Sequence, residues 1–195
     1  SVNKTDGNDA QRLALFLSKG LLPEVRMKDK RYAEVASLVQ TRDKLVKLRT
    51  SLKNKINNLV SARGVNLKKE SLSSEKGLQE VLKFKFDDLV DLELRVLVDQ
   101  IRGLNRSIEE LGEATKEAGQ ELPGHRNIKS IKGIGSLGAS IILSAIGEVG
   151  DFADEGRLAS YFGIVPRVAN SNESFRSGRI TKRGNKLART TLVQC

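Results

Sequence analysis

The feature that most constrains this chain is a run of apolar residues spaced alternately four and three positions apart near its middle. The seven residues are Val90, Leu94, Leu97, Ile101, Leu104, Ile108 and Leu111. Residues at this spacing lie on one side of a helix, so the run predicts a long helix with three heptads of apolar seam. A helix with such a seam is stable in water only when the seam packs against another apolar surface.

An earlier segment offers a partner for this seam. Between about residues 29 and 62, apolar residues again follow a spacing of three and four, and Arg42 and Arg49 occupy two positions of the same series. The apolar members are Val35, Leu38, Leu45, Leu52, Ile56 and Leu59. Two interpretations remain open, because both bury the same stripe. In one, the two helices form an antiparallel hairpin; in the other, the seam joins copies of the chain as a dimer or tetramer.

Shorter elements flank the two long helices. An apolar run over 13–17 predicts a short helix that Gly20 ends. Such a helix needs a surface to pack on, so we expect it to close a domain whose earlier part is absent. Residues 64–86 predict a connection with a turn or short helix, and Leu122-Pro123-Gly124 opens a compact C-terminal unit. In this unit we expect helices over 125–131, 136–148, 155–162 and 181–194.

Charge is concentrated at the C-terminal end. The chain carries a net charge of +10, and residues 163–195 hold seven basic residues and one acidic residue, an excess of six. A concentrated basic patch indicates contact with phosphate groups.

One cysteine and one histidine exclude a structural zinc site and a Cys–His or Ser–His catalytic pair. No apolar run approaches transmembrane length. We therefore expect a soluble intracellular protein with an anionic partner and no membrane contact.

The segment Ile131-Lys132-Gly133-Ile134-Gly135 fits a helix-hairpin-helix pattern. Its glycines let backbone N–H groups approach a phosphate, and a second helix begins there with its positive dipole end. The alternative is an ordinary glycine turn between packed helices. A hairpin of this kind would contact the DNA backbone without reading sequence.

The basic tail, residues 163–195, contains the serines Ser171, Ser174 and Ser177. Attack of a serine on a phosphate needs an exposed hydroxyl, positive charge and help in removing a proton. The tail supplies the first two, although residue content alone favours a flexible basic loop that only contacts DNA. Together with the glycine turn, it gives these candidate DNA-binding residues: Lys132, Gly133, Gly135, Arg167, Arg176, Arg179, Lys182, Arg183 and Lys186.

Two carboxylates near the start, Asp6 and Asp9, are three residues apart. This spacing places both on one side of a helix start, where they could share a divalent metal. By residue type alone, capping of the helix is the favoured interpretation.

Together and in this order, these segments resemble the insertion-sequence one-ten (IS110-type) family of transposases. The stretch Lys4-Thr5-Asp6-x-x-Asp9-Ala10-x-x-Leu13-Ala14 is similar to the motif that closes the family's RuvC-like nuclease domain. The stretch from Leu38 to Asn54 resembles the start of the family's coiled coil. Matches to the C-terminal transposase domain follow in order at 131–139, 147–152, 160–167 and 178–185.

The resemblance implies a fold: a mainly α chain of long antiparallel coiled-coil helices, followed by a small all-α domain with a helix-hairpin-helix. Residues 1–28 would be the C-terminal remnant of an α/β RuvC-like (RNase H-like) domain, residues 29–122 the coiled coil, and residues 123–195 a transposase domain truncated at its C-terminal end. It also implies chemistry. By spacing from Gly163-Ile164-Val165-Pro166-Arg167, the nucleophile is Ser171, and Asp6 and Asp9 help to bind Mg²⁺.

By the same resemblance, the serine attacks a DNA phosphate and holds the strand as a phosphoserine. Recent members of the family are guided to their DNA by a bridge RNA, so the resemblance also implies a guide RNA as partner. Asn172 follows Ser171 where the family commonly has glycine, which leaves Ser174 and Ser177 as lesser candidates. Since the upstream carboxylates are absent, we expect this chain alone to bind DNA without recombining it. The alternatives are a non-catalytic DNA-binding module with coiled-coil dimerisation and a purely structural dimerisation protein. We expect a prokaryotic cytoplasmic protein associated with the nucleoid.

Overall fold

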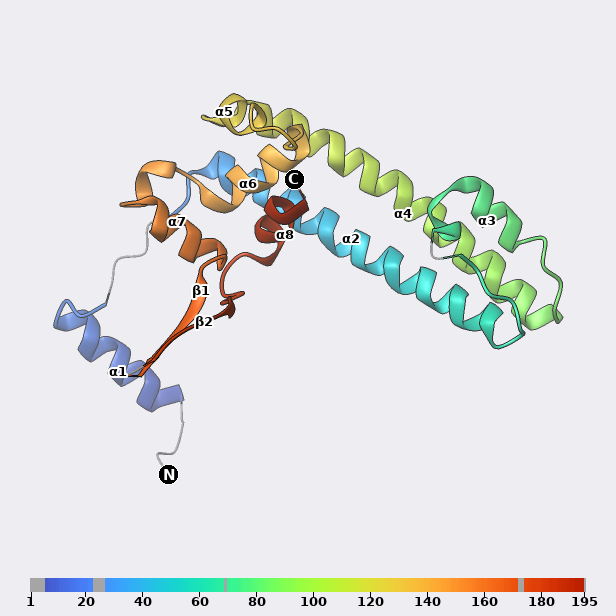
Figure 1. Cartoon of the computed structure of the whole chain (residues 1–195), viewed down its shortest axis with the longest axis horizontal. Coiled ribbons are helices and arrows are strands. Elements are labelled where there is room, and N and C mark those ends of the chain that lie inside the picture. Colours follow the sequence, from blue (N-terminus) through green and yellow to red (C-terminus); the bar gives the residue numbers. More distant parts are fainter. Residues whose placement is uncertain (1–5, 23–26, 69, 172–173, 195) are drawn as a thin grey trace.

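The computed structural model describes residues 6–22, 27–68, 70–171 and 174–194. Its helices are α1 (Asp6–Ser18), α2 (Lys30–Ser61), α3 (Glu75–Val81), α4 (Asp88–Gln120), α5 (His125–Lys129), α6 (Ser136–Ile146), α7 (Glu155–Phe162) and α8 (Lys186–Gln194), with 3₁₀ turns η1 (Ser71–Ser73) and η2 (Val149–Asp151) and strands β1 (Pro166–Ser171) and β2 (Ser174–Ile180). Figure 1 shows a long arm of α2, α3 and α4, a head of α5 to α8 with the two strands, and α1 standing apart. The prediction of a mainly α protein is confirmed.

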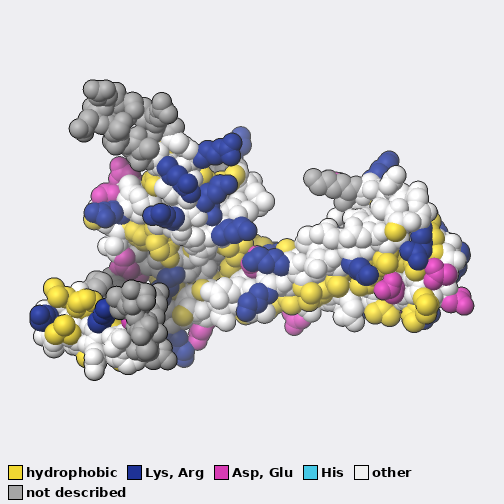
Figure 2. Space-filling view, turned by 90° about the horizontal axis from the view of Figure 1, so that it is seen from below, with side chains coloured by type: hydrophobic (Ala, Val, Ile, Leu, Met, Phe, Trp, Pro, Cys, Tyr) yellow, Lys and Arg dark blue, Asp and Glu magenta, His cyan; other side chains and the backbone are white. Residues whose placement is uncertain are grey.

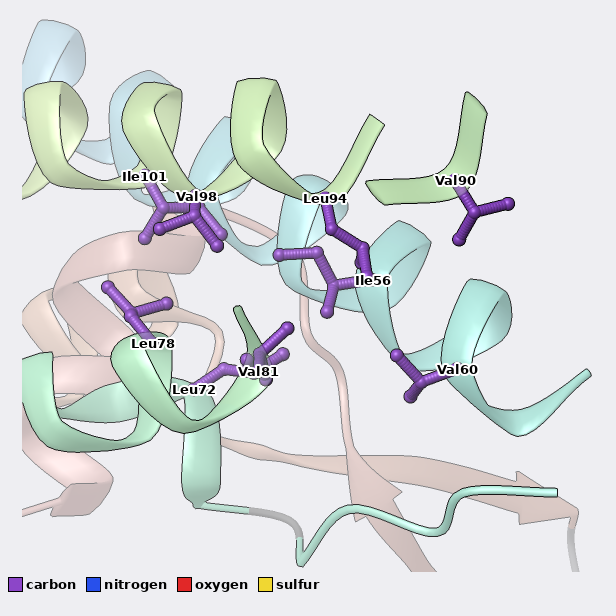
Figure 3. Packing of buried hydrophobic residues seen from close by; sticks show 9 residues of the cluster. All are labelled: Ile56, Val60, Leu72, Leu78, Val81, Val90, Leu94, Val98 and Ile101. Carbon is purple, nitrogen blue, oxygen red and sulfur yellow. The ribbon is translucent and has the colours of Figure 1, made fainter. Parts of the chain in front are cut away.

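The arm is an antiparallel hairpin of α2 and α4, so the two seams pair within one chain, which is the first of the two interpretations left open by the sequence. Its far end is closed by α3, the short helix predicted for the connection. Figure 3 shows branched side chains from α2, η1, α3 and α4 meeting there. The buried residues are Ile56, Val60, Leu72, Leu78, Val81, Val90, Leu94, Val98 and Ile101.

Most predicted seam positions face inward. On α4, Val90, Leu94, Ile101 and Ile108 are buried and the other three seam leucines are partly buried. Val98, which the strict heptad leaves out, is also fully buried because α3 widens the covered side.

The two arginines in the seam of α2 also lie towards α4. Arg49 Nη1 donates a hydrogen bond to Asn105 Oδ1 at 2.9 Å. A Cβ atom on Gly112 would lie 3.4 Å from Arg42 Nε. Burial, with a smaller contribution from neighbouring Arg49, lowers the pKa of Arg42. Each guanidinium group therefore takes the place of an apolar seam side chain. Arg49 lies opposite the Asn105 amide, and Arg42 lies opposite Gly112.

The beginnings of the long helices follow the usual rules for caps. Asp29 accepts a hydrogen bond from the Arg31 N–H at the start of α2. Asp87 accepts from the Val90 N–H at the start of α4, whose first turn also carries Asp88 and Asp91. Carboxylates at these positions satisfy free N–H groups and favour the helix dipole.

The head joins the arm through small residues of α4. Beyond the apolar seam, Gly112, Thr115 and Gly119 are buried, and α6 packs against this end of the helix. A Cβ atom on Gly119 would lie 3.2 Å from Ser140 Cα and would overlap the Ser140 hydroxyl. Every residue of α6 from Ala139 to Ile146 is buried. Glycine at this point therefore allows α6, the central helix of the head, to approach α4 closely.

The prediction of an all-α C-terminal unit is wrong in one segment. β1 and β2 form an antiparallel hairpin, with Pro166 paired to Ile180 and Ser171 to Ser174. Helix α8 begins at Lys186 rather than at residue 181. The reason is a backbone pairing between distant segments: the Thr181 N–H donates to Val165 O at 2.9 Å, and the Lys182 N–H donates to Gly163 O at 3.1 Å. These bonds hold the chain out of a helix until residue 186. The other predicted helices of the unit are present, with ends shifted by no more than two residues.

Helix α1 has the short length expected and ends before Gly20, whose φ is +62°. Its apolar side chains are exposed: 57% for Leu13, 44% for Phe16 and 69% for Leu17. Within the described residues, no helix combines the length and apolar character needed to cross a membrane.

The contact between α4 and α6 leads to a stability prediction. Gly119→Ala should lower the free energy of unfolding by about 1–3 kcal/mol, because the new methyl group overlaps Ser140. Gly103→Ala is the matched control in the same helix, since a Cβ atom there meets nothing within 4 Å. It should raise stability by up to about 1 kcal/mol through helix propensity. Urea unfolding followed by circular dichroism measures both, and equal stabilisation by the two variants would contradict the close contact.

Candidate nucleic-acid interface

The predicted glycine turn joins α5 to α6. Gly133 has a φ of +99°, a left-handed conformation that favours glycine. Gly135 precedes α6 in an extended conformation and has open space around it. Lys132 is exposed beside them, while Ile134 is buried in the head. The turn is therefore anchored by one apolar side chain and presents backbone and a lysine to solvent.

Buried His125 fixes this turn from the inside. Its Nε2 lies 3.2 Å from the carbonyl oxygen of Ser136 and 3.3 Å from Ser140 Oγ. A carbonyl oxygen only accepts, so we assign the ring N–H to Nε2. The Ser140 hydroxyl donates to the same Ser136 carbonyl at 2.9 Å. This Ser–His contact lies in the interior of the head and ties the start of α5 to the first turns of α6, which is a structural role.

The segment 182–184, just before α8, crosses the end of α7 at two glycines, one from each segment. Gly163 has a φ of +68°, and a Cβ atom there would overlap the Arg183 backbone. Gly184 has a φ of +102°, and a Cβ atom there would overlap the Tyr161 carbonyl. Between them Lys182 has a φ of +55°, the one non-glycine residue with positive φ in the described chain. The crossing therefore holds Lys182 and Arg183 in a fixed, exposed turn.

The basic residues around this crossing divide by burial. Lys182, Arg183 and Lys186 are exposed, as a role in binding requires. Arg189, three residues beyond Lys186 on α8, is 9% exposed, and its Nη1 donates to Phe162 O at 2.9 Å. Arg189 therefore stabilises the crossing and does not belong to the interface.

The three candidate serines lie in the hairpin. Ser171 is the last residue of β1 and is paired with Ser174, the first residue of β2, while Ser177 is paired with Val168. The structure describes the backbone of these residues but no side chain from 168 to 177, so the Arg176 side chain also lies outside the described part. At the base of the hairpin, Arg167 and Arg179 are exposed.

The two predicted metal ligands lie at the start of α1. Asp6 is the first residue of the helix, and its side chain is outside the described part; Asp9 is exposed one turn later. Among the described side chains, no group of three or more His, Cys, Asp or Glu residues could hold a metal ion.

The turn and the tail belong to one packed unit. α8 packs on α6, and Ile134, Ala139, Phe162 and Ala188 share one buried cluster. The head thus carries the glycine turn on α6 and the basic residues at the start of α8 in a fixed relation.

Two basic residues of the arm, which the sequence analysis did not select, also lie near the tail. Lys44 and Lys47 of α2 line a groove with Asn185 and Leu187, which flank the start of α8. Lys28 lies in the same groove, but its Nζ donates to the carbonyl oxygens of Ser144 and Ala145, and burial lowers its pKa. The charge excess of the segment that forms α2, which has eight basic and two acidic residues, is the sequence signal that could have identified Lys44 and Lys47.

Two family models match the chain, and both describe transposases, enzymes that cut and rejoin DNA. A model for the transposase IS116/IS110/IS902 family matches residues 125–195, and a model for DEDD transposases of IS110 type matches residues 1–63. The chain belongs to the IS110-type family of transposases. The resemblance inferred from the sequence is therefore confirmed.

Curated relatives are similar along nearly all of the chain. The transposase of insertion sequence element IS1111A from Coxiella burnetii is 29% identical over 98% of this chain and 53% of its own length. The probable family 20 transposase of Pseudomonas aeruginosa is 25% identical over 98% of the chain and 58% of its own length. The putative transposase y4pF/y4sB of Sinorhizobium fredii is 27% identical over 97% and 49%. The chain thus spans about half the length of these relatives.

The division of basic residues on α8 can be tested by stability. Arg189→Gln should lower the free energy of unfolding by about 1–3 kcal/mol, because it leaves the buried Phe162 carbonyl without its donor. Lys186→Gln, which removes the same charge from an exposed position, should change stability by less than about 0.5 kcal/mol. Thermal unfolding measures the difference, and a larger loss for Lys186→Gln would show that the structural residue is misassigned.

Proposed function

We propose that this chain is the DNA-binding and nucleophile-bearing part of a transposase that cuts and rejoins DNA strands. The observation that carries the proposal is the crossing of α7 and the tail, which fixes Lys182 and Arg183 in an exposed turn. A rigid cationic turn at the base of the hairpin that bears Ser171 suits a surface that must hold a phosphate beside a hydroxyl.

The turn between α5 and α6 would act as a helix-hairpin-helix. Its exposed glycines admit a DNA phosphate to the backbone N–H groups at the start of α6, and Lys132 adds a positive charge. Such contacts position the DNA without reading its sequence. Arg167, Arg179 and Lys186 would contact neighbouring phosphates, and Arg176 belongs to the same proposed set.

The proposed reaction is a transesterification. The hydroxyl of Ser171 attacks a DNA phosphorus, a bond between that phosphorus and serine oxygen forms, and one phosphorus–oxygen bond of the DNA strand breaks. The departing DNA oxygen takes up a proton as the serine loses one. Attack of a DNA hydroxyl on the phosphoserine then reverses these steps and rejoins a strand. The number of ester bonds is unchanged, so no external energy source is consumed.

We further propose that Asp6 and Asp9 help to bind Mg²⁺ in the complete enzyme. Residues three apart on a helix have Cβ atoms about 5–6 Å apart, and Asp9 is exposed at this position. Mg²⁺ in nucleic-acid enzymes is commonly held by one or two carboxylates together with water and substrate phosphates. The donor set of α1 fits that pattern, and the ion would supply charge stabilisation at the phosphate.

We also propose that a bridge RNA selects the DNA. We further propose that several copies of the protein assemble through the arm. Support for assembly comes from the outer side of α4. Leu89, Leu92 and Val96 follow a spacing of three and four there and are 76%, 46% and 50% exposed. Exposed apolar residues on one helix side are typical of a surface that pairs with a partner.

DNA binding can be measured on this chain directly. The variant Lys182→Gln/Arg183→Gln/Lys186→Gln should bind duplex DNA at least about tenfold more weakly at 0.1 M salt, with a smaller dependence on salt. The control Lys68→Gln/Lys76→Gln/Lys83→Gln removes the same charge from exposed positions at the far end of the arm. Fluorescence anisotropy with labelled DNA measures both, and equal binding by the two variants would contradict a tail interface.

The chemistry needs a protein of the relatives' length that contains this chain, together with DNA, guide RNA and Mg²⁺. A covalent DNA–protein adduct should form, be lost in Ser171→Ala and persist in Ser174→Ala, because only the first removes the nucleophile. Denaturing gel electrophoresis of labelled DNA detects the adduct. Persistence of the adduct in Ser171→Ala would exclude this serine. Binding of DNA with no adduct from any of the three serines would favour the non-catalytic binding module.

A further inference from the structure

The two long helices of the arm carry opposite charge. α2 has eight basic and two acidic residues, an excess of six positive charges. α4 has four basic and eight acidic residues, an excess of four negative charges. Since the whole chain has a net charge of +10 and residues 163–195 supply +6, α2 and the tail together account for all of the positive excess.

The outward side of α2 is a continuous polar stripe. Residues three and four positions apart share a helix side, and this series runs over five turns: Gln40, Lys44, Lys47, Ser51, Asn54, Lys55 and Asn58. All seven are exposed, none is acidic, and each can donate hydrogen bonds. A stripe of donors without a carboxylate matches the row of acceptors on a phosphodiester backbone.

Two acidic residues flank the stripe and pair with its lysines. Asp43 binds Lys47, and Glu93 of α4 lies 3.8 Å from Lys55. The two lysine side chains are nevertheless 66% and 53% exposed in these pairs. Ion pairs of lysines this exposed are weak, so exchange of these carboxylates for phosphate costs little.

The stripe continues the surface of the tail. Lys44 and Lys47 line the groove of about 230 Å³ whose other wall includes Asn185 and Leu187, next to Lys186. Figure 2 views the molecule from below, and α2 lies below α4 in Figure 1. Lys and Arg side chains gather over the head in that view and continue onto the near part of the arm, with few acidic side chains between them.

We propose that the stripe of α2 is a docking surface for the backbone of duplex DNA that extends from the tail along the arm. This inference rests on the proposed DNA-binding function and deepens it. The stripe is about 27 Å long at 1.5 Å per residue, which corresponds to about eight base pairs. Lysine, serine and amide side chains on phosphates fix the path of the duplex and carry no sequence preference.

The test uses the whole chain and four triple variants with two duplexes, one of about 10 and one of about 30 base pairs. Lys44→Gln/Lys47→Gln/Lys55→Gln should bind the long duplex at least about tenfold more weakly than the wild type. The slope of log K against log salt should become less negative by about 2 to 3. Its binding of the short duplex, which the tail alone accommodates, should be nearly unchanged. Lys44→Arg/Lys47→Arg/Lys55→Arg keeps the charge and should bind like the wild type.

The controls separate this proposal from the proposed function. The far-arm variant Lys68→Gln/Lys76→Gln/Lys83→Gln should bind like the wild type, and circular dichroism should show that all variants fold. If the tail variant loses affinity while the α2 variant does not, the docking surface is refuted and the DNA-binding tail stands. If neither loses affinity, the proposed function itself fails. A loss confined to an RNA hairpin of the same length, with duplex DNA unaffected, would overturn the assignment of the surface to DNA.

Discussion

The structure depends on how one helix is covered along its whole length. α4 has 33 residues, and its buried side changes character along the way. Over the first half, branched residues such as Val90, Leu94 and Ile101 are covered by α2 and α3. Over the last turns, Gly112, Thr115 and Gly119 are buried instead, and α6 approaches close to the backbone. The first half makes the arm and the second half fixes the head to it, so both proposed DNA surfaces keep their positions through one helix.

This change of character explains which parts of the fold could be predicted. The arm was predictable because each heptad repeats the same signal, and errors at single positions such as Val98 do not alter it. The contact of Gly119 with Ser140 carries no apolar signal, since small residues pack by shape alone. The hairpin and the late start of α8 depend on backbone bonds between Gly163 and Lys182, nineteen positions apart. Local patterns cannot contain such a pairing, and the segment was therefore predicted as a loop and a longer helix.

The candidate interface shows a similar division. The exposure of Lys132, Lys182, Arg183 and Lys186 agrees with the prediction that they contact DNA, although it does not test that contact. Arg189 has the same charge and lies in the same helix as Lys186, yet it is buried on the Phe162 carbonyl. Composition cannot separate these two roles, because the difference lies in which side of α8 faces α7. The roles of Ser171, Asp6 and Asp9 stay predictions from the family resemblance, since their side chains are either exposed or outside the described part.

The opposite charges of α2 and α4 have a consequence for orientation. Axes of packed helices lie about 8–10 Å apart, which is close to the Debye length of about 8 Å at physiological ionic strength. The acidic residues of α4 are therefore only partly screened from a polyanion approaching α2, and they offset part of its attraction to the nearer basic residues of α2. A polyanion approaching α4 instead meets a helix with an excess of four negative charges and is attracted less. An arm with uniform positive charge would attract DNA to any side, whereas opposite charges on α2 and α4 would favour the proposed surface on α2, which is continuous with the tail. In the proposed interaction, charge on α4 would thus contribute to DNA recognition by disfavouring wrong orientations rather than by contact.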